Sequence, residues 1–174
     1  MSKYVYGFGA GWADGKADQK ERLGGKGANL AEMCLLGIPV PAGFTITTGA
    51  CVEYFTAGMT FPAGLEAEVN AALAKIETEM KMPFGAAANP LLVSCRSGAR
   101  QSMPGMMETV LNVGLTTKTI PGLIKQTGDE RFAIEIHQMN PVKDARQSPQ
   151  IQVVAVSGPQ DAQLARRPKV ALQQ

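Results

Sequence analysis

The sequence predicts a mixed α/β fold of the α+β kind, and three observations indicate it. Short apolar, β-branched runs such as residues 91–95 are typical of buried strands. Longer segments such as residues 65–80 repeat their apolar positions with helical spacing. Glycine and proline separate these segments up to Gly128. The resulting order of strand, helix, strand, helix, helix and strand is typical of packed layers of helices and sheet.

The first predicted elements surround a glycine-rich stretch. Residues 4–11 alternate apolar and small side chains, as expected for a strand that enters a tight turn. Residues 28–36 have helical spacing, and Gly37 is a suitable C-terminal cap. The predicted buried face of this helix consists of Leu30, Met33 and Cys34.

The later elements lead toward a loop that contains two arginines. Residues 44–48 predict a short strand that feeds a helix near Thr48, and residues 65–80 predict a longer amphipathic helix. Arg96 directly follows the predicted strand at 91–95 and begins a loop that runs to about residue 107. Thr119 can cap a short helix with proline in its first turn.

Composition excludes several classes of function. The chain has 174 residues, of which 45% are hydrophobic and 18% charged, with a net charge of +2. A nucleic-acid binder would show a clustered basic face, and a membrane span needs roughly 18 apolar residues in a row. We therefore expect neither partner. Cys34, Cys51 and Cys95 lack metal-site spacing and are read as reduced core residues, which with the absent secretory signal predicts the cytoplasm.

The last part of the chain has a different character. Residues 134–174 contain no aromatic residue and a single glycine, and only residues 151–156 have the pattern of a short strand. We expect a domain over residues 1–133 and a poorly structured tail, either loosely attached or disordered, over residues 134–174.

Two motifs could bind phosphate. The first is Gly24-Gly-Lys-Gly at the entrance to a helix, where glycine backbone N–H groups and the helix dipole favour an anion. Lys26 would add a mobile ammonium group. The spacing is not that of a Walker A motif. The same residues also fit a glycine turn with a solvated lysine, so both interpretations stand at this point.

The second motif is the loop that follows the strand at 91–95. Arg96 is held at the strand end, and its planar guanidinium can grip phosphate oxygens. Ser102 and Thr109 add hydroxyl groups, and Gly105 can serve as a hinge. A surface loop whose arginines pair with carboxylates explains the same pattern.

Together, three stretches carry a resemblance to a known family. They are Gly24-Gly-Lys-Gly-Ala-Asn-Leu-Ala-Glu-Met, Gly37-Ile-Pro-Val-Pro-Ala-Gly-Phe-Thr-Ile-Thr-Thr and Val93-Ser-Cys-Arg-Ser-Gly-Ala-Arg-Gln-Ser-Met-Pro-Gly-Met-Met-Glu-Thr-Val-Leu-Asn. The chain resembles pyruvate, phosphate dikinase over about residues 3–133. The third stretch is the most specific to that family, whereas the first two are shared more loosely with phosphoenolpyruvate synthases.

The resemblance implies a fold, a reaction and a site. The fold is the first subdomain of an ATP-grasp-like domain, and the reaction converts ATP, phosphate and pyruvate to AMP, diphosphate and phosphoenolpyruvate. Magnesium is the implied metal, and the implied assembly is a homo-oligomer. The implied ATP-phosphate contacts are Lys26, Arg96, Ser102, Met103, Gly105 and Thr109.

Parts of the family pattern are missing from the sequence. We find no magnesium carboxylates and no phosphohistidine motif, and the only histidine, His137, does not match that motif. The expectation is therefore an ATP-binding fragment that supplies no catalytic residue and no metal ligand and is inactive alone. The alternatives are a truncated, non-catalytic nucleotide-binding module and the related phosphoenolpyruvate synthase.

Overall fold

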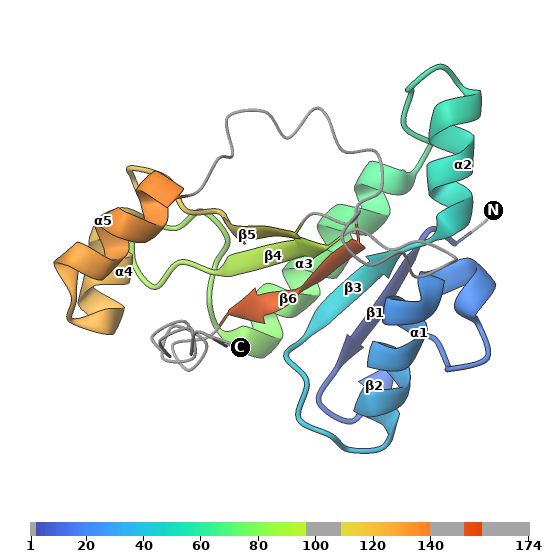
Figure 1. Cartoon of the computed structure of the whole chain (residues 1–174), viewed down its shortest axis with the longest axis horizontal. Coiled ribbons are helices and arrows are strands. Elements are labelled where there is room, and N and C mark those ends of the chain that lie inside the picture. Colours follow the sequence, from blue (N-terminus) through green and yellow to red (C-terminus); the bar gives the residue numbers. More distant parts are fainter. Residues whose placement is uncertain (1–2, 97–108, 140–151, 158–174) are drawn as a thin grey trace, which may run out of the picture.

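The computed structural model describes residues 3–96, 109–139 and 152–157, which form two small sheets with helices around them (Figure 1). The strand orders are β2-β1-β3 and β5-β4-β6. The strands are β1 (Val5–Gly9), β2 (Trp12–Ala13), β3 (Gly43–Ile46), β4 (Leu92–Arg96), β5 (Thr109–Val113) and β6 (Gln152–Ser157). The helices are α1 (Lys20–Leu35), α2 (Thr48–Thr56), α3 (Leu65–Met80), α4 (Ile120–Thr127) and α5 (Glu130–Met139). The predicted mixed α/β class is confirmed.

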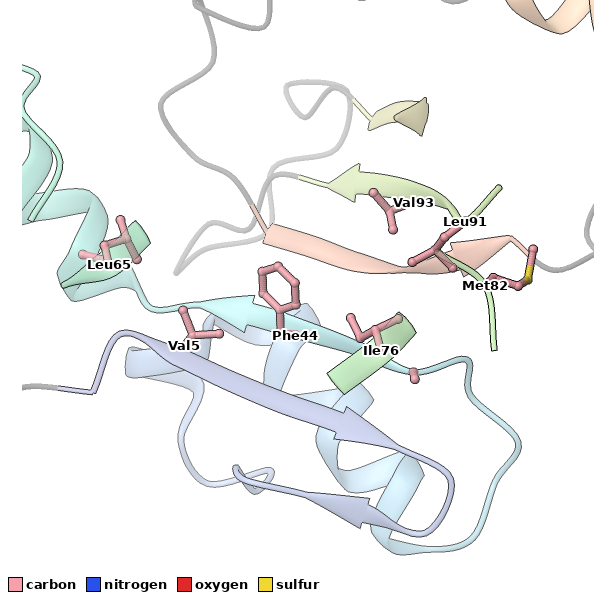
Figure 2. Packing of buried hydrophobic residues seen from close by; sticks show 9 residues of the cluster. Val5, Phe44, Leu65, Ile76, Met82, Leu91 and Val93 are labelled. Carbon is pink, nitrogen blue, oxygen red and sulfur yellow. The ribbon is translucent and has the colours of Figure 1, made fainter. Parts of the chain in front are cut away.

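The first sheet lies between α1 and α3. Strand β1 is antiparallel to both β2 and β3, and Val5 pairs with Ile46. Because side chains alternate along a strand, Tyr6 packs with Leu23 on the α1 side while Val5 enters the core on the α3 side. This core contains Val5, Ala42, Phe44, Ala50, Leu65, Ile76, Met82, Leu91 and Val93, and most of them are labelled in Figure 2.

Two carboxylates attach α3 to the first sheet. The side chain of Glu68 accepts hydrogen bonds from the backbone N–H groups of Tyr4 and Val5, both at 2.8 Å. At the other end of the helix, Glu79 accepts a hydrogen bond from the indole Nε1 of Trp12 in β2 at 3.3 Å. These contacts position the sheet on α3 and thereby fix the face on which α1 packs.

The second sheet continues beside the first. Strand β4 is central, with β5 and β6 antiparallel on its two sides. Strand β6 also lies close to β3, so it is the edge of the second sheet that faces the first sheet (Figure 1). The short strand expected near residues 151–156 is present as β6.

Helix α1 differs from its prediction in two ways. It begins at Lys20 rather than at residue 28, and Met33 is 37% exposed. Cys34 of the predicted face is buried at 0% exposure and Leu30 packs against it, whereas the rest of the buried face consists of Leu23 and the small residues Ala28 and Ala31. Small side chains let the helix lie close to the sheet, and the larger Met33 is displaced to the edge of the contact. The cap at Gly37, with a φ of 76°, is confirmed.

The remaining differences concern the second half of the chain. Strand β5 and helix α5 were not predicted, and α5 extends past residue 133, with Ala133 buried and Ile136 packed beside it. Thr119 does precede α4, but its side chain makes no capping bond to that helix. The division at residues 133 and 134 stays a prediction.

The cysteines agree with the expectation of unpaired core residues. None of the three cysteines, all of which lie in described parts of the chain, forms a disulfide. Burial raises the pKa of each thiol, as expected for core cysteines of low reactivity. Across the described ranges, every helix is too short or too polar to span a bilayer.

Candidate functional site

The glycine motif forms a break inside α1. Gly24 has φ 70° and ψ 164°, a backbone conformation that is open essentially only to glycine. One helical turn from Lys20 therefore ends there, and a second helical segment begins at Gly25. The first N–H groups of a helix lack partners within it and carry a partial positive charge. The predicted glycine turn at a helix entrance is thus present.

Close packing fixes this break against the sheet. A Cβ atom added to Gly27 would lie 2.8 Å from both Oγ1 and Cγ2 of Thr45 in β3, and 3.3 Å from Cβ of Leu23. Real Cβ atoms essentially never approach other atoms so closely. Glycine at position 27 therefore lets the start of the second helical segment rest directly on β3. By contrast, a Cβ atom on Gly25 would meet no atom within 4 Å.

Three threonines lie at and just after the end of β3, and two of them, Thr45 and Thr48, contact α1. The Oγ1 of Thr48 donates a hydrogen bond to the backbone oxygen of Glu21 at 2.5 Å. The Oγ1 of Thr47 accepts the N–H of Ala50 at 3.3 Å and caps α2. The Oγ1 of Thr45 is buried and has no hydrogen-bond partner among the described residues. Sequence reasoning did not identify these threonines as part of the site.

The basic side chains at the break have different environments. Lys26 lies in the first turn after Gly24 and is exposed, and it makes no ion pair with any residue in the described ranges. Arg22, in the preceding turn, instead donates from Nη1 to the hydroxyl of Tyr6 at 2.9 Å. Lys26 is therefore the side chain at this turn that is available to a ligand.

The second motif begins where β4 ends. Arg96 is the last residue of β4 and is exposed. It pairs across the sheet with Thr109 of β5, so the structure brings these two predicted site residues together. Strands β3 and β4 point in the same direction, so that the end of β4 and the end of β3 lie at the same end of the molecule (Figure 1). Ser102, Met103 and Gly105 lie outside the described residues.

Acidic side chains in the described ranges do not form a metal site. No three of the histidine, cysteine, aspartate and glutamate side chains described there gather closely enough to hold an ion. The carboxylates of Glu68, Glu79 and Asp14 are occupied by backbone N–H groups. The described residues consequently do not fit a magnesium ion, and no step can be assigned to one here.

Comparisons with known proteins relate part of this chain to one family. Residues 20–63 match the family model described as "Pyruvate phosphate dikinase, AMP/ATP-binding domain". The chain is 53% identical over 133 residues to the pyruvate, phosphate dikinase of Rhizobium meliloti (strain 1021), which covers 76% of this chain and 15% of that protein. The enzyme of Clostridium symbiosum is 46% identical over 138 residues, with coverage of 79% and 15%.

A plant relative gives the same result. Pyruvate, phosphate dikinase 1, chloroplastic, of Zea mays is 51% identical over 133 residues, which is 76% of this chain and 14% of that protein. The chain thus spans about 15% of the length of the curated relatives it matches. The predicted resemblance is confirmed: over about three quarters of its length this chain is similar to pyruvate, phosphate dikinases, and residues 20–63 match the AMP/ATP-binding domain of that family.

Proposed function

We propose that this chain is an ATP-binding part of a pyruvate, phosphate dikinase and that Lys26 and Arg96 contact the phosphates. The whole enzyme would convert ATP, phosphate and pyruvate to AMP, diphosphate and phosphoenolpyruvate. The observation that carries the proposal is the break at Gly24, which starts a helix with exposed Lys26 in its first turn. This break lies inside the segment that matches an AMP/ATP-binding domain.

The break has the chemistry that a phosphate needs. Backbone N–H groups at the start of a helix converge on an anion, and the helix dipole favours negative charge there. An exposed ammonium group adds a charge-assisted contact that is worth about 1.5–3 kcal/mol. Both features meet at Lys26, because it lies in the turn where the unpaired N–H groups are.

Arg96 supplies the second contact in this proposal. Its guanidinium follows directly from a buried strand, which limits the motion of its backbone, and Thr109 lies opposite on β5. The shared direction of β3 and β4 supports one phosphate-binding surface that includes the break in α1. Ser102, Met103 and Gly105 would complete this surface as a loop over the polyphosphate.

The finer architecture belongs to the same proposal. The described half of the site would be one subdomain of an ATP-grasp, and the second subdomain would supply the magnesium ligands. Bridging metal ions are central to phosphoryl transfer. We therefore expect the chain alone to bind ATP weakly and to catalyse no turnover. We also propose that the whole enzyme is cytoplasmic, forms a homo-oligomer and uses pyruvate as a substrate.

The alternative is a nucleotide-binding module without catalytic partners. The lack of a metal-binding cluster in the described part of the chain favours it as the second candidate. The two are separated by adding the remaining part of a related dikinase to this chain. Formation of AMP and phosphoenolpyruvate in the mixture would support the enzyme part, and binding without turnover would support the module.

Titration of ATP into the purified chain tests the binding itself. Two charged contacts predict a Kd from roughly high micromolar to millimolar after the entropy of association is subtracted. We expect Lys26→Ala and Arg96→Ala each to weaken binding about tenfold. Lys118→Ala is the control, because this exposed lysine precedes α4, far from α1 (Figure 1). Equal affinity for the wild type and the Lys26 variant would contradict the proposal.

A further inference from the structure

The hydroxyl group of Thr45 is unusual within the described part of the molecule. Thr45, Thr47, Ser94 and Thr119 are the buried polar residues there. Of their side-chain atoms, only the Oγ1 of Thr45 is fully buried without a hydrogen-bond partner in the described ranges, and the residue is 1% exposed. Most buried polar atoms in proteins are paired, because an unpaired one loses its hydration without compensation. A specific unpaired group therefore needs a physical explanation.

The hydroxyl lies beside the start of the second segment of α1, together with the methyl group of Thr45. It lies 2.8 Å from the position that a Cβ atom on Gly27 would take. Cα–Cβ bonds in a helix tilt toward the N-terminus. Thr45 consequently lies on the side of Gly27 that faces the break at Gly24. The unpaired N–H groups that could bind a phosphate belong to the same turn.

The turn has room to change its conformation slightly. Gly24 already adopts a conformation outside the helix, and Gly25 has no neighbouring atoms within 4 Å of an added Cβ. The sheet side of the turn is fixed, however, because Gly27 rests on Thr45. A ligand that draws the N–H groups of this turn toward itself would therefore move the backbone next to the Thr45 hydroxyl.

We propose that Thr45 is a positioning residue for phosphate binding, whose hydroxyl hydrogen-bonds to the backbone of residues 24–27 when a phosphate occupies the break. The inference rests on the proposed ATP-binding function. Without ligand the hydroxyl is unpaired, and with ligand it gains a partner. Phosphate binding and formation of this hydrogen bond are therefore coupled, and the bound conformation of the turn is the one that Thr45 stabilises.

If Thr45 has this role, the stability of the unliganded fold and the affinity for ATP change independently in Thr45 variants. Thr45→Val keeps the shape of the side chain and removes an unpaired buried hydroxyl, so the unliganded fold is as stable as the wild type or more stable. The same variant loses the hydrogen bond of the bound state, and its ATP affinity falls about fivefold, or about 1 kcal/mol. Thr45→Ser keeps the hydroxyl and loses a buried methyl group, so stability falls while affinity is retained.

The experiment measures chemical denaturation and ATP affinity for the full chain and for Thr45→Val, Thr45→Ser and Lys26→Ala. Backbone amide NMR shifts of Gly25 and Gly27 on addition of ATP serve as the local readout, and they detect millimolar binding. We expect the shift of Gly27 to shrink in Thr45→Val and to persist in Thr45→Ser.

The outcomes separate this inference from the function on which it rests. If wild-type chain does not bind ATP, or Lys26→Ala binds as well, the proposed function fails and the role of Thr45 with it. If Lys26→Ala weakens binding but Thr45→Val binds like wild type, only the role of Thr45 is overturned. If Thr45→Ser loses as much ATP affinity as Thr45→Val, the loss comes from the missing methyl group and not from the hydroxyl. That result would also overturn the role of Thr45.

Discussion

Two threonines, Thr45 in the half of the molecule built around the first sheet and α1, and Thr119 in the half built around the second sheet and α4, are both almost fully buried. Their hydroxyl groups differ in whether they form hydrogen bonds. Thr119, at 0% exposure, precedes α4, and its Oγ1 accepts the N–H of Thr116 at 2.8 Å and lies 3.1 Å from the oxygen of Gly114. Thr45, at 1% exposure, lies under α1 and has no partner in the described ranges. The buried hydroxyl beside α4 therefore forms its hydrogen bonds within the fold, whereas the buried hydroxyl beside α1 still lacks a partner next to the proposed ligand site.

The glycines of the two halves show a related difference. A Cβ atom on Gly122 of α4 would overlap the backbone oxygen of Ala87 and lie 2.9 Å from Cδ of Pro90. The corresponding contact of Gly27 in α1 is with side-chain atoms of Thr45 and Leu23. A side chain can adjust more readily than a backbone carbonyl. The packing of α1 is therefore the more adaptable of the two.

The largest effect is expected from Gly122→Ala. The new methyl group would meet the backbone of Ala87, which cannot move without displacing the loop before β4. We expect a loss of about 3 kcal/mol in the free energy of unfolding, at the upper end of the range for overpacking. Denaturant titration measures it, with Gly25→Ala as the control that meets no atoms. If Gly122→Ala lost less than about 0.5 kcal/mol of unfolding free energy, the packing of α4 would be no more rigid than that of α1.

Thr119→Val should have the next largest effect. The substitution keeps the side-chain shape but leaves the N–H of Thr116 without its acceptor. An unpaired group costs roughly 1–3 kcal/mol when it is buried, and this hydrogen bond is part-buried, so we expect about 1.5 kcal/mol of destabilisation. Thermal or chemical unfolding of this variant beside Thr45→Val makes the comparison direct. Equal losses in the two variants would refute the distinction between a satisfied and an unsatisfied threonine.

Gly27→Ala is expected to have a smaller effect on stability. Its methyl group would lie too close to Thr45, but alanine favours the helix more than glycine does, which offsets part of the cost. We expect a net loss of about 1 kcal/mol together with weaker ATP binding. Unfolding and ATP titration are measured on the same preparation. Unchanged ATP binding in a folded variant would indicate that the contact of α1 with β3 does not shape the site.

The smallest effect concerns pH and Asp14, next to β2. Burial opposes its ionisation, but hydrogen bonds from the Lys3 ammonium and the Gly7 N–H, each at 2.9 Å, prevail and lower the pKa of the carboxyl group. A lowered folded-state pKa contributes stability above the unfolded pKa of about 3.9, and that stability is lost as pH falls through the folded value.

The pair is partly exposed, so the contribution is below about 1 kcal/mol after solvent screening. Asp14→Asn should be slightly less stable than wild type at neutral pH, and the difference should disappear at low pH. Unfolding curves between pH 7 and pH 2 test the sign. A difference that grows on acidification would contradict the direction of the pKa shift.

The sequence was sufficient for elements with strong periodicity or glycine punctuation. Apolar spacing predicted α3, and β-branching predicted the strand that became β4. The glycine turn before Lys26 was also predicted, because only glycine adopts the conformation found at Gly24. In each case the local sequence determines the local conformation.

Other features depend on contacts that the sequence does not specify. The unpaired hydroxyl of Thr45 arises only when Gly27 brings α1 onto β3. The pairing of Arg96 with Thr109 required a strand, β5, in which no residue is fully buried and the apolar residues Val110 and Leu111 are adjacent rather than alternating. Met33 was assigned to the wrong face, since small side chains rather than the largest ones determine how closely α1 packs.

The most direct test of the account maps ATP on the whole chain by backbone amide NMR. The central claim is that phosphates bind at the break in α1 and at the end of β4. The account predicts ATP-induced shifts at residues 24–27, 45–48 and 96, little change in α4 and α5, and loss of these shifts in Lys26→Ala. Shifts confined to α4 and α5, or none at millimolar ATP, would contradict it.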